Sequence, residues 1–196
     1  IIATYAKQAL AQGIPEVVIV SADKDLMQLI RPGVSMLDPI KNRPLGPQQV
    51  QERFGVPPEK VVDVQALAGD STDNVPGVPG IGVKTAAELI LQFGDLETLL
   101  SRAGEIKQPK RRENLLANAD MARICKKLVS LNDEVPLDVP LQELTWNPPD
   151  QDKLTAFIAA QGFKSLIPRI LARLSAGRAA TSKAAPEPAK AVTGKG

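Results

Sequence analysis

Histidine is absent from this chain of 196 residues, and cysteine occurs only once, at Cys125. Without imidazole, catalysis by histidine and most zinc sites are excluded, so any chemistry must depend on carboxylates, lysine, tyrosine, hydroxyl groups or a hard metal ion. A single cysteine cannot form an internal disulfide, which favours a reducing compartment, and we expect Cys125 to be a small buried residue. No apolar run approaches the roughly 20 residues of a membrane-spanning helix, so we expect no membrane partner.

The formal net charge of +2 is unevenly distributed along the chain. The segment from Arg178 onward is basic, and the remainder is close to neutral, so a polyanion would have to bind a local patch. The best candidate is residues 102–127, which contain eight basic residues against three acidic ones. Within it, Lys110, Arg111 and Arg112 lie at the start of a predicted helix, where the dipole disfavours cations, so we predict that they contact DNA. A solvated charged face is the alternative.

The first part of the chain predicts a small α/β layer. Apolar residues recur at helical spacing over residues 1–12 and stop at Gly13. Residues 16–21 are a β-branched run typical of a parallel strand buried on both faces, and residues 34–37 predict a second strand. An uncapped helix at the first residue and an Ala/Pro/Lys-rich segment at 177–196, typical of a flexible linker, predict a chain cut from a longer polypeptide.

Short helices are predicted for most of the remainder. Proline at helix starts and glycine at helix ends delimit them. The longest is predicted as one continuous helix over residues 109–129, and residues 135–139 as a short extended segment. Trp146, before a Pro-Pro loop, is expected to plug the edge of the core. The other predicted helices cover residues 47–54, 59–68, 84–93, 150–160 and 163–174, with a short helix at 26–30 and one that follows Asp95 as its N-cap.

The stretch from Gly69 to Ile90 combines two carboxylates with a glycine-rich turn. Asp70 and Asp73 come first, and a Pro-rich turn then leads into a helix. Unpaired amides and the helix dipole at such a turn favour an anion. The pattern therefore predicts a phosphate-binding site that comprises Gly77, Gly80, Gly82, Lys84 and Thr85.

A second pair of carboxylates, Asp23 and Asp25, follows the first predicted strand directly, at the edge where ligands bind in open α/β sheets. Together with Asp70 and Asp73 they form an all-oxygen set, which selects a hard cation such as Mg²⁺ or Mn²⁺. Four carboxylates at one point would repel one another strongly unless metal neutralised them. The alternative for Asp23 is a helix N-cap, with Asp25 in the first turn.

Two segments, SADKDLMQL at residues 21–29 and ALAGDSTDNVPGVPGIGVKTA at residues 66–86, carry a specific resemblance. With the order of elements around them, they closely resemble the 5′-3′ exonuclease domain of bacterial DNA polymerase I, a flap-endonuclease family. The resemblance covers roughly residues 1–175. It implies an α/β fold, with a partial PIN-like parallel sheet followed by a helical DNA-binding region of the helix-hairpin-helix type.

The resemblance also implies how the chain divides into domains. Residues 1–46 correspond to the C-terminal part of the nuclease core, residues 47–176 to a helical DNA clamp with its motif at 75–90, and residues 177–196 to a linker toward polymerase and proofreading domains. In the family, the carboxylates that match Asp23, Asp25, Asp70 and Asp73 hold catalytic divalent ions. The turn that matches residues 77–82 clamps the duplex backbone, often with a monovalent cation such as K⁺.

The substrate class implied is double-stranded DNA with a 5′ flap or nick, or an RNA primer, in replication and repair. We accordingly expect a cytoplasmic, nucleoid-associated bacterial monomer. One departure matters: the family has further metal carboxylates in a preceding strand and in a Glu-Ala-Asp-Asp run that would stand before Ile1, and a basic arch before that. We therefore expect this chain alone to cleave poorly.

Two other functions are compatible with parts of the pattern. A non-catalytic, structure-specific DNA-binding module could use the same turn, and metal-dependent cleavage would distinguish it from a nuclease. Phosphatases of the haloacid dehalogenase type also place Asp-x-Asp after a strand, with the first Asp as nucleophile. They expect threonine or valine where Met27 stands, and they leave the glycine turn unexplained.

Overall fold

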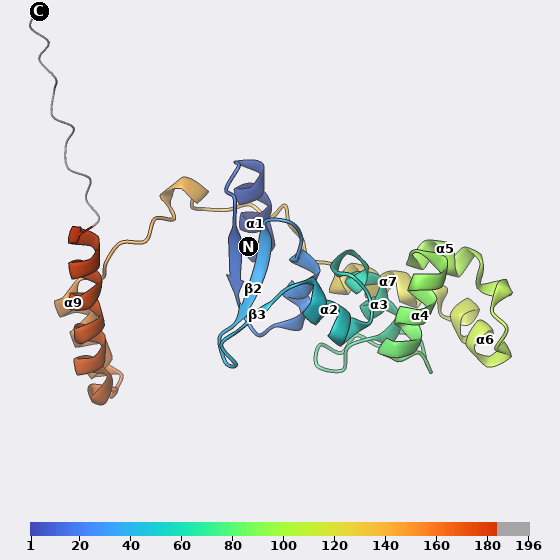
Figure 1. Ribbon diagram of the computed structural model, residues 1–196. Helices are drawn as coiled ribbons and strands as arrows, with labels where there is room; N and C mark the ends of the chain where they lie inside the picture. Colours follow the sequence, from blue (N-terminus) through green and yellow to red (C-terminus); the bar gives the residue numbers. More distant parts are fainter. Residues whose placement is uncertain (184–196) are drawn as a thin grey trace, which may run out of the picture. The chain divides into compact units, whose positions relative to one another are not determined.

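The computed structural model describes residues 1–183. The chain divides into two compact units, Ile1–Glu143 and a second unit that starts at Leu144 (Figure 1). Among the residues described, no helix is both long and apolar enough to cross a membrane.

A small mixed sheet with one helix beside it opens the first unit. Strand β1 pairs in parallel with β2, and β2 pairs antiparallel with β3, a strand that no pattern in the sequence predicts. The predicted helix and the two predicted strands are confirmed, and the short helix after β1 is of the 3₁₀ type. The elements are α1 (Ile2–Ala11), β1 (Val17–Val20), η1 (Lys24–Leu29), β2 (Val34–Asp38) and β3 (Arg43–Leu45).

The expectation that the first strand is buried on both faces is wrong for this structure. Val18 and Val20 are 48% and 62% exposed, whereas Ile19 between them is buried. Val18 and Val20 share a sheet face with Ser35 and Leu37 of β2, which are only half-buried, so the described elements cover this face incompletely.

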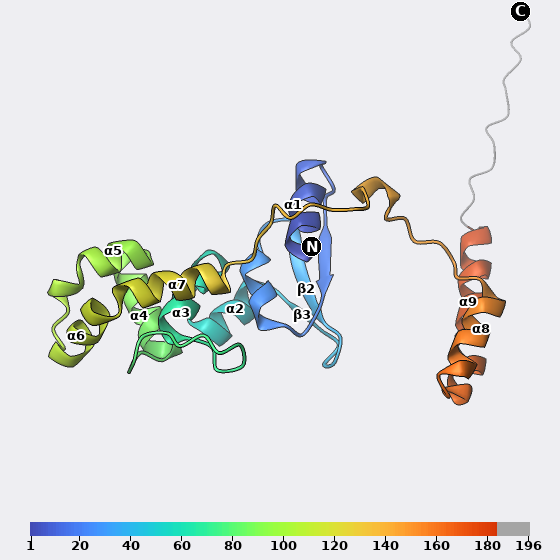
Figure 2. The same cartoon turned by 180° about the vertical axis from the view of Figure 1, so that it is seen from behind.

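Short helices form the rest of the first unit, as predicted. Helix α3 lies at their centre and packs against both α4 and α7 (Figure 2). This packing fully buries its apolar residues Val61, Val64 and Leu67. The elements are α2 (Pro47–Phe54), η2 (Pro58–Lys60), α3 (Val61–Ala68), α4 (Val83–Phe93), α5 (Leu96–Ser101), η3 (Ala103–Glu105), α6 (Pro109–Ala117) and α7 (Ala119–Val129).

The single helix predicted over residues 109–129 is in fact two helices that break at Asn118. Its side-chain amide donates to the carbonyl of Asn114 at 2.8 Å, a local bond that competes with helix continuation. The break allows Leu115 on α6 and Cys125 on α7 to be buried completely, and Cys125 is the small buried residue that was expected.

After α7 the chain returns to the first helix. Gln28 fixes the start of this return by donating to the carbonyl of Val129 at 3.0 Å and accepting from the amide of Leu131 at 3.1 Å. The Tyr5 hydroxyl then donates to the carbonyl of Val139 at 2.8 Å. Residues 135–139 form no strand, and the short η4 (Leu141–Glu143) follows.

The second unit comprises α8 (Gln151–Ala160), η5 (Lys164–Leu166) and α9 (Ile167–Lys183), so both predicted helices are present. Trp146 is 75% exposed and does not plug a core, because it lies in an irregular Pro-containing segment. The predicted linker is also corrected in part: residues 177–183 continue α9, whereas residues 184–196 lie outside the described residues.

Candidate metal centre and nucleic-acid interface

Three of the four predicted carboxylates converge. Asp25 on η1, Asp70 just after α3 and Asp73 in the following turn each offer an oxygen, and these oxygens lie within 4.8 Å of one another. Asp70 is buried, Asp25 half-buried and Asp73 exposed, so the cluster extends from the core to the surface. Asp23 is not in this group; its carboxylate caps η1 and accepts from the amide of Asp25 at 3.0 Å.

The position of Asp70 follows from the end of α3. Gly69 ends the helix with a φ of +73°, and Asp70 and Val75 then exchange two backbone hydrogen bonds of 2.8 Å. The loop they close turns through Asn74, which adopts a φ of +56°. Backbone bonds on both sides of Asp70 therefore fix its carboxylate in place.

Asp70 has favourable partners for its charged form. The ammonium of Lys24 contacts its Oδ2, and the amide of Thr72 donates to its Oδ1 at 3.0 Å. The contact with Lys24 is the largest cause that lowers the pKa of Asp70. Burial raises this pKa, and the hydrogen bond from Thr72 lowers it further. Asp70 is thus held as a carboxylate.

Asp25 is shifted the other way. Burial is the first cause that raises its pKa, and the negative charges of Asp23 and Asp70 add to it. The side chain of Gln65 offsets part of this shift by donating to Asp25 Oδ1 at 2.6 Å. Sequence reasoning missed Gln65, although a polar residue inside the apolar run at 61–68 was a signal.

The donor set fits a hard divalent cation. The ligand atoms that converge in the cluster are carboxylate oxygens, and burial together with the neighbouring negative charges raises the pKa of Asp25, which a cation would counteract. The Oε1 atom of Gln65 beside the cluster is buried and has no hydrogen-bond partner among the described residues, which leaves a further hard oxygen available for a ligand or a water.

The glycine turn lies next to this cluster and leads directly into α4. Val78 and Ile81 anchor it by burial, whereas Gly80 and Gly82 are exposed. Gly82 is the N-cap of α4, and no side chain caps this end. The first amides of α4 therefore keep the open donors that a phosphate requires, with Lys84 exposed in the first turn and Thr85 half-buried behind it.

Gly77 has a different position from the other two predicted glycines. It is buried, with a φ of +64°, and a Cβ atom there would meet the backbone of residues 67–69. The structure therefore gives Gly77 a packing role at the base of the turn, which orients the exposed part that follows.

The basic segment 102–127 is to a large extent paired within the protein, as the charged-face alternative proposed. Arg112 donates to the carbonyl of Ile106 at 3.1 Å, and Lys110 lies 3.7 Å from Glu113. The remaining ion pairs are Arg102 with Glu105, Arg123 with Glu97 and Asp120, and Lys126 with Asp63.

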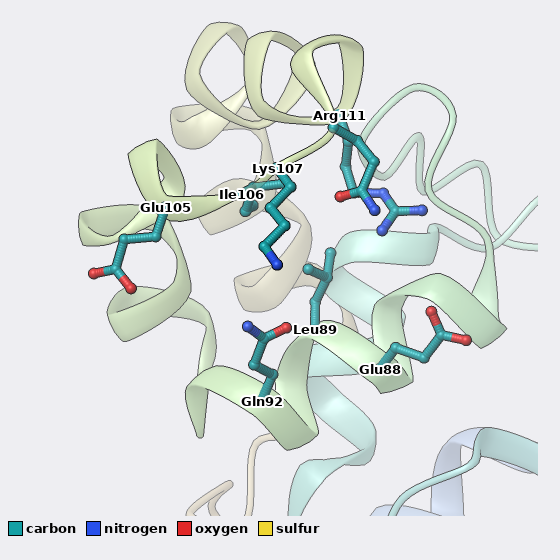
Figure 3. A pocket seen from close by; sticks show the side chains of 8 residues that line it. Glu88, Leu89, Gln92, Glu105, Ile106, Lys107 and Arg111 are labelled. Atoms are coloured by element: carbon teal, nitrogen blue, oxygen red, sulfur yellow. The ribbon is translucent and has the colours of Figure 1, made fainter.

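Four basic residues of this segment form no ion pair among the described residues: Lys107, Arg111, Arg112 and Lys127. Lys107 and Arg111 line a pocket of about 300 Å³ between α4 and α6, together with Glu88 and Gln92. Figure 3 shows the Lys107 side chain extending across this pocket toward Gln92. Arg111 is therefore the one of the three predicted DNA contacts whose charge is not engaged inside the protein.

Two family models match consecutive parts of the chain, and both describe domains of 5′-3′ exonucleases. Residues 1–55 match the N-terminal resolvase-like domain of 5′-3′ exonucleases, and residues 56–152 match their C-terminal SAM-fold domain.

Curated relatives are similar over most of the chain. DNA polymerase I of Rhizobium leguminosarum is 55% identical over 170 residues, and that of Bacillus caldotenax is 38% identical over 174 residues; each alignment covers 87% of this chain. The matched region is 17% and 20% of those relatives, so the chain spans about a fifth of their length or less.

Solved structures agree on the fold. A bacteriophage T5 5′-exonuclease with bound zinc superposes with a TM-score of 0.60 and 26% identity, over 65% of this chain and 48% of that one. A T5 flap endonuclease variant in a complex with DNA and metal ions gives a TM-score of 0.59 and 25% identity, over 65% and 47% of the two chains.

Proposed function

The chain belongs to the 5′-3′ exonuclease family, and we propose that it supplies metal-binding and DNA-binding parts of a 5′-3′ exonuclease or flap endonuclease within a DNA polymerase I. The observation that carries this proposal is the convergence of Asp25, Asp70 and Asp73, two of which lie on the loop that leads through the glycine turn to the uncapped start of α4. A carboxylate cluster next to open backbone amides suits a reaction at a phosphodiester.

The proposed metal is Mg²⁺ or Mn²⁺, held by Asp25, Asp70 and Asp73, with Asp23 adjacent on the same helix. When bound, such an ion supplies electrophilic stabilisation of the scissile phosphate and activation of water. Before an ion binds, the protein's own contribution is to keep Asp70 ionised through Lys24 and Thr72, and to orient Asp25 through Gln65.

The proposed DNA contacts lie on the turn and on α4. Gly80, Gly82, Lys84 and Thr85 present amides, a charge and a hydroxyl to the phosphate backbone, which gives binding that depends on DNA structure and not on sequence. Gly77 supports the turn from below, and Lys110, Arg111 and Arg112 extend the contact surface, with Arg111 the best placed. A monovalent cation such as K⁺ at residues 77–82 would have to share the Pro79 carbonyl with Asn114, which donates to it at 2.7 Å.

The substrates proposed are 5′ flaps, nicks and RNA primers during replication and repair, in the bacterial cytoplasm at the nucleoid. Residues 1–46 would belong to the nuclease core and residues 47–176 to the DNA clamp of a monomer that is linked to polymerase and proofreading domains. We propose further that this chain alone cleaves weakly. Three converging carboxylates are few for the two-ion arrangement that stabilises both the attacking and the leaving oxygen.

Mn²⁺ titration of the chain tests the metal site directly. The Asp70→Asn variant should lose most of the affinity, and Asp138→Asn, which removes an exposed carboxylate outside the cluster, should retain it. Equal affinity in both variants would refute the metal site.

Activity requires a second experiment in a longer polypeptide that contains this chain. There, Asp70→Asn should abolish metal-dependent flap cleavage and leave DNA binding nearly intact. If the unsubstituted longer polypeptide binds flap DNA and shows no metal-dependent cleavage, the non-catalytic DNA-binding alternative is correct.

A further inference from the structure

The carboxylate cluster contains a cation of its own. Lys24 stands between Asp23 and Asp25 in the sequence and opens η1, and its ammonium contacts Oδ2 of Asp70, a residue on a different element. Among the described residues, Lys24 is the basic residue that forms an ion pair with the cluster. Its partner is Asp70, whereas Asp25 and Asp73 form no ion pair.

This ion pair occupies an oxygen that a metal would need. Oδ1 of Asp70 already accepts from the amide of Thr72, so Oδ2 is the oxygen with more capacity for an outside ligand, and Lys24 is in contact with it. An ammonium and a divalent cation cannot share one carboxylate oxygen at contact distance without strong repulsion. The two cations therefore compete for the same atom.

The surroundings of Lys24 also allow it to leave. The Asp70 side chain is only 4% exposed, whereas that of Lys24 is 25% exposed, so its flexible stem reaches the cluster from the surface. Its ammonium can rotate toward water while Asp70 stays in place, held by the bridge to Val75.

We propose that Lys24 is the internal counter-ion of the carboxylate cluster: it holds Asp70 and the DNA-binding loop in position before metal binds, and it is displaced from Asp70 by the divalent cation. Lys24 is in this sense a positioning residue that lowers the apparent metal affinity. The inference rests on the proposed metal site, and it adds a competition that the metal ligands alone do not require.

Substitution of Lys24 tests the competition without any measurement of cleavage. Lys24→Met removes the ammonium and keeps a side chain of similar length. Its matched control is Lys127→Met, which makes the same change in net charge at an exposed site on α7 without an ion pair among the described residues. The readouts are the Mn²⁺ dissociation constant, from calorimetry or electron paramagnetic resonance, and the melting temperature in the presence of EDTA.

Lys24→Met should bind Mn²⁺ at least about fivefold more tightly than the Lys127→Met control. A fivefold change is about the lower end of the coupling seen between linked sites. Without metal it should melt at a lower temperature than the control, and Mn²⁺ should raise its melting temperature by a larger amount. Lys24→Arg, which keeps the charge, should bind Mn²⁺ no more tightly than wild type. Unchanged or weaker Mn²⁺ binding by Lys24→Met would overturn the proposal.

A measurement on the unsubstituted chain removes any dependence on how the variants fold. Mild acylation of lysines, read by mass spectrometry, should label Lys24 faster once Mg²⁺ is added, because the ammonium is then released to water, while labelling of Lys127 stays constant. Labelling of Lys24 that does not rise with Mg²⁺ would also overturn the competition.

The two proposals fail in different ways. If wild type and Asp70→Asn bind Mn²⁺ equally, the metal site itself is wrong. If Asp70→Asn loses binding but Lys24→Met matches wild type, the metal site stands and only the role of Lys24 is wrong.

Discussion

Gly69 and Gly77 meet backbone to backbone where the carboxylate cluster joins the DNA-binding turn. Both have positive φ, +73° and +64°, and a Cβ on Gly69 would lie 2.6 Å from the carbonyl oxygen of Val75. A Cβ on Gly77 would collide with the amide nitrogen of Gly69. Because only hydrogen fits on either side of this contact, the loop that carries Asp70 and the turn that leads to α4 are held as one rigid piece.

Gly77→Ala should therefore be strongly destabilising. The left-handed backbone costs an alanine about 1–2 kcal/mol, and the collision with Gly69 adds to this, so a loss of about 3 kcal/mol in the free energy of unfolding is expected. Urea denaturation measures it. Gly104→Ala is the control, since a Cβ there meets nothing within 4 Å, and it should stay near wild type. Equal stability of the two variants would contradict the close contact.

Lys84→Ala should weaken the binding of all DNA sequences to a similar extent. The exposed ammonium in the first turn of α4 is expected to neutralise one phosphate, so the slope of log K against log salt should fall by about 0.9. Fluorescence anisotropy at several salt concentrations measures both effects, with Lys41→Ala, exposed in the turn between β2 and β3, as control. A defect confined to particular sequences would count against a backbone contact.

Lys126→Met should destabilise the packing of α7 on α3. Lys126 pairs at 2.6 Å with Asp63, whose side chain is only 9% exposed, so its removal leaves a carboxylate without a partner in a nearly closed site. The expected loss is about 1–3 kcal/mol in the free energy of unfolding.

A double variant separates this pair from general packing. Asp63→Asn combined with Lys126→Met removes both charges and should recover much of the stability lost by Lys126→Met alone. Additive losses in the double-mutant cycle, measured by urea denaturation, would show that the pair is not coupled.

Asp95 should make α5 sensitive to acid. The amide of Thr98 is the first cause that lowers the pKa of this N-cap residue, and the Thr98 hydroxyl is the second. A carboxyl whose pKa is lower in the folded state stabilises the fold above its unfolded pKa, and this contribution disappears as the pH falls through the folded value. Asp95→Asn retains a capping side chain that does not titrate. The stability difference between wild type and Asp95→Asn should therefore shrink from neutral pH to below the usual range of an aspartate, and a constant difference would exclude the effect.

Much of the fold was predictable because its signals are local. Glycine and proline mark the ends of α2 and α4, and the β-branched run marks β1, since these residue types act within a few positions of themselves. The exposed face of β1 and the break at Asn118 were not predictable in the same way. The first depends on which elements cover that face of the sheet, and the second on whether α6 and α7 can both reach the core.

The sequence by itself determined the chemistry of the site. With no histidine and a single cysteine, the carboxylates of two short motifs were the candidate metal ligands, and hard cations suit them. Only the tertiary structure decided how those carboxylates are used. It left Asp23 as a helix cap, buried Asp70 against Lys24, and brought Gln65 to Asp25 across 40 positions of the chain. The physical reason is that composition and spacing limit which atoms can bind a cation, whereas burial and ion pairing arise from contacts between elements that are distant in the sequence.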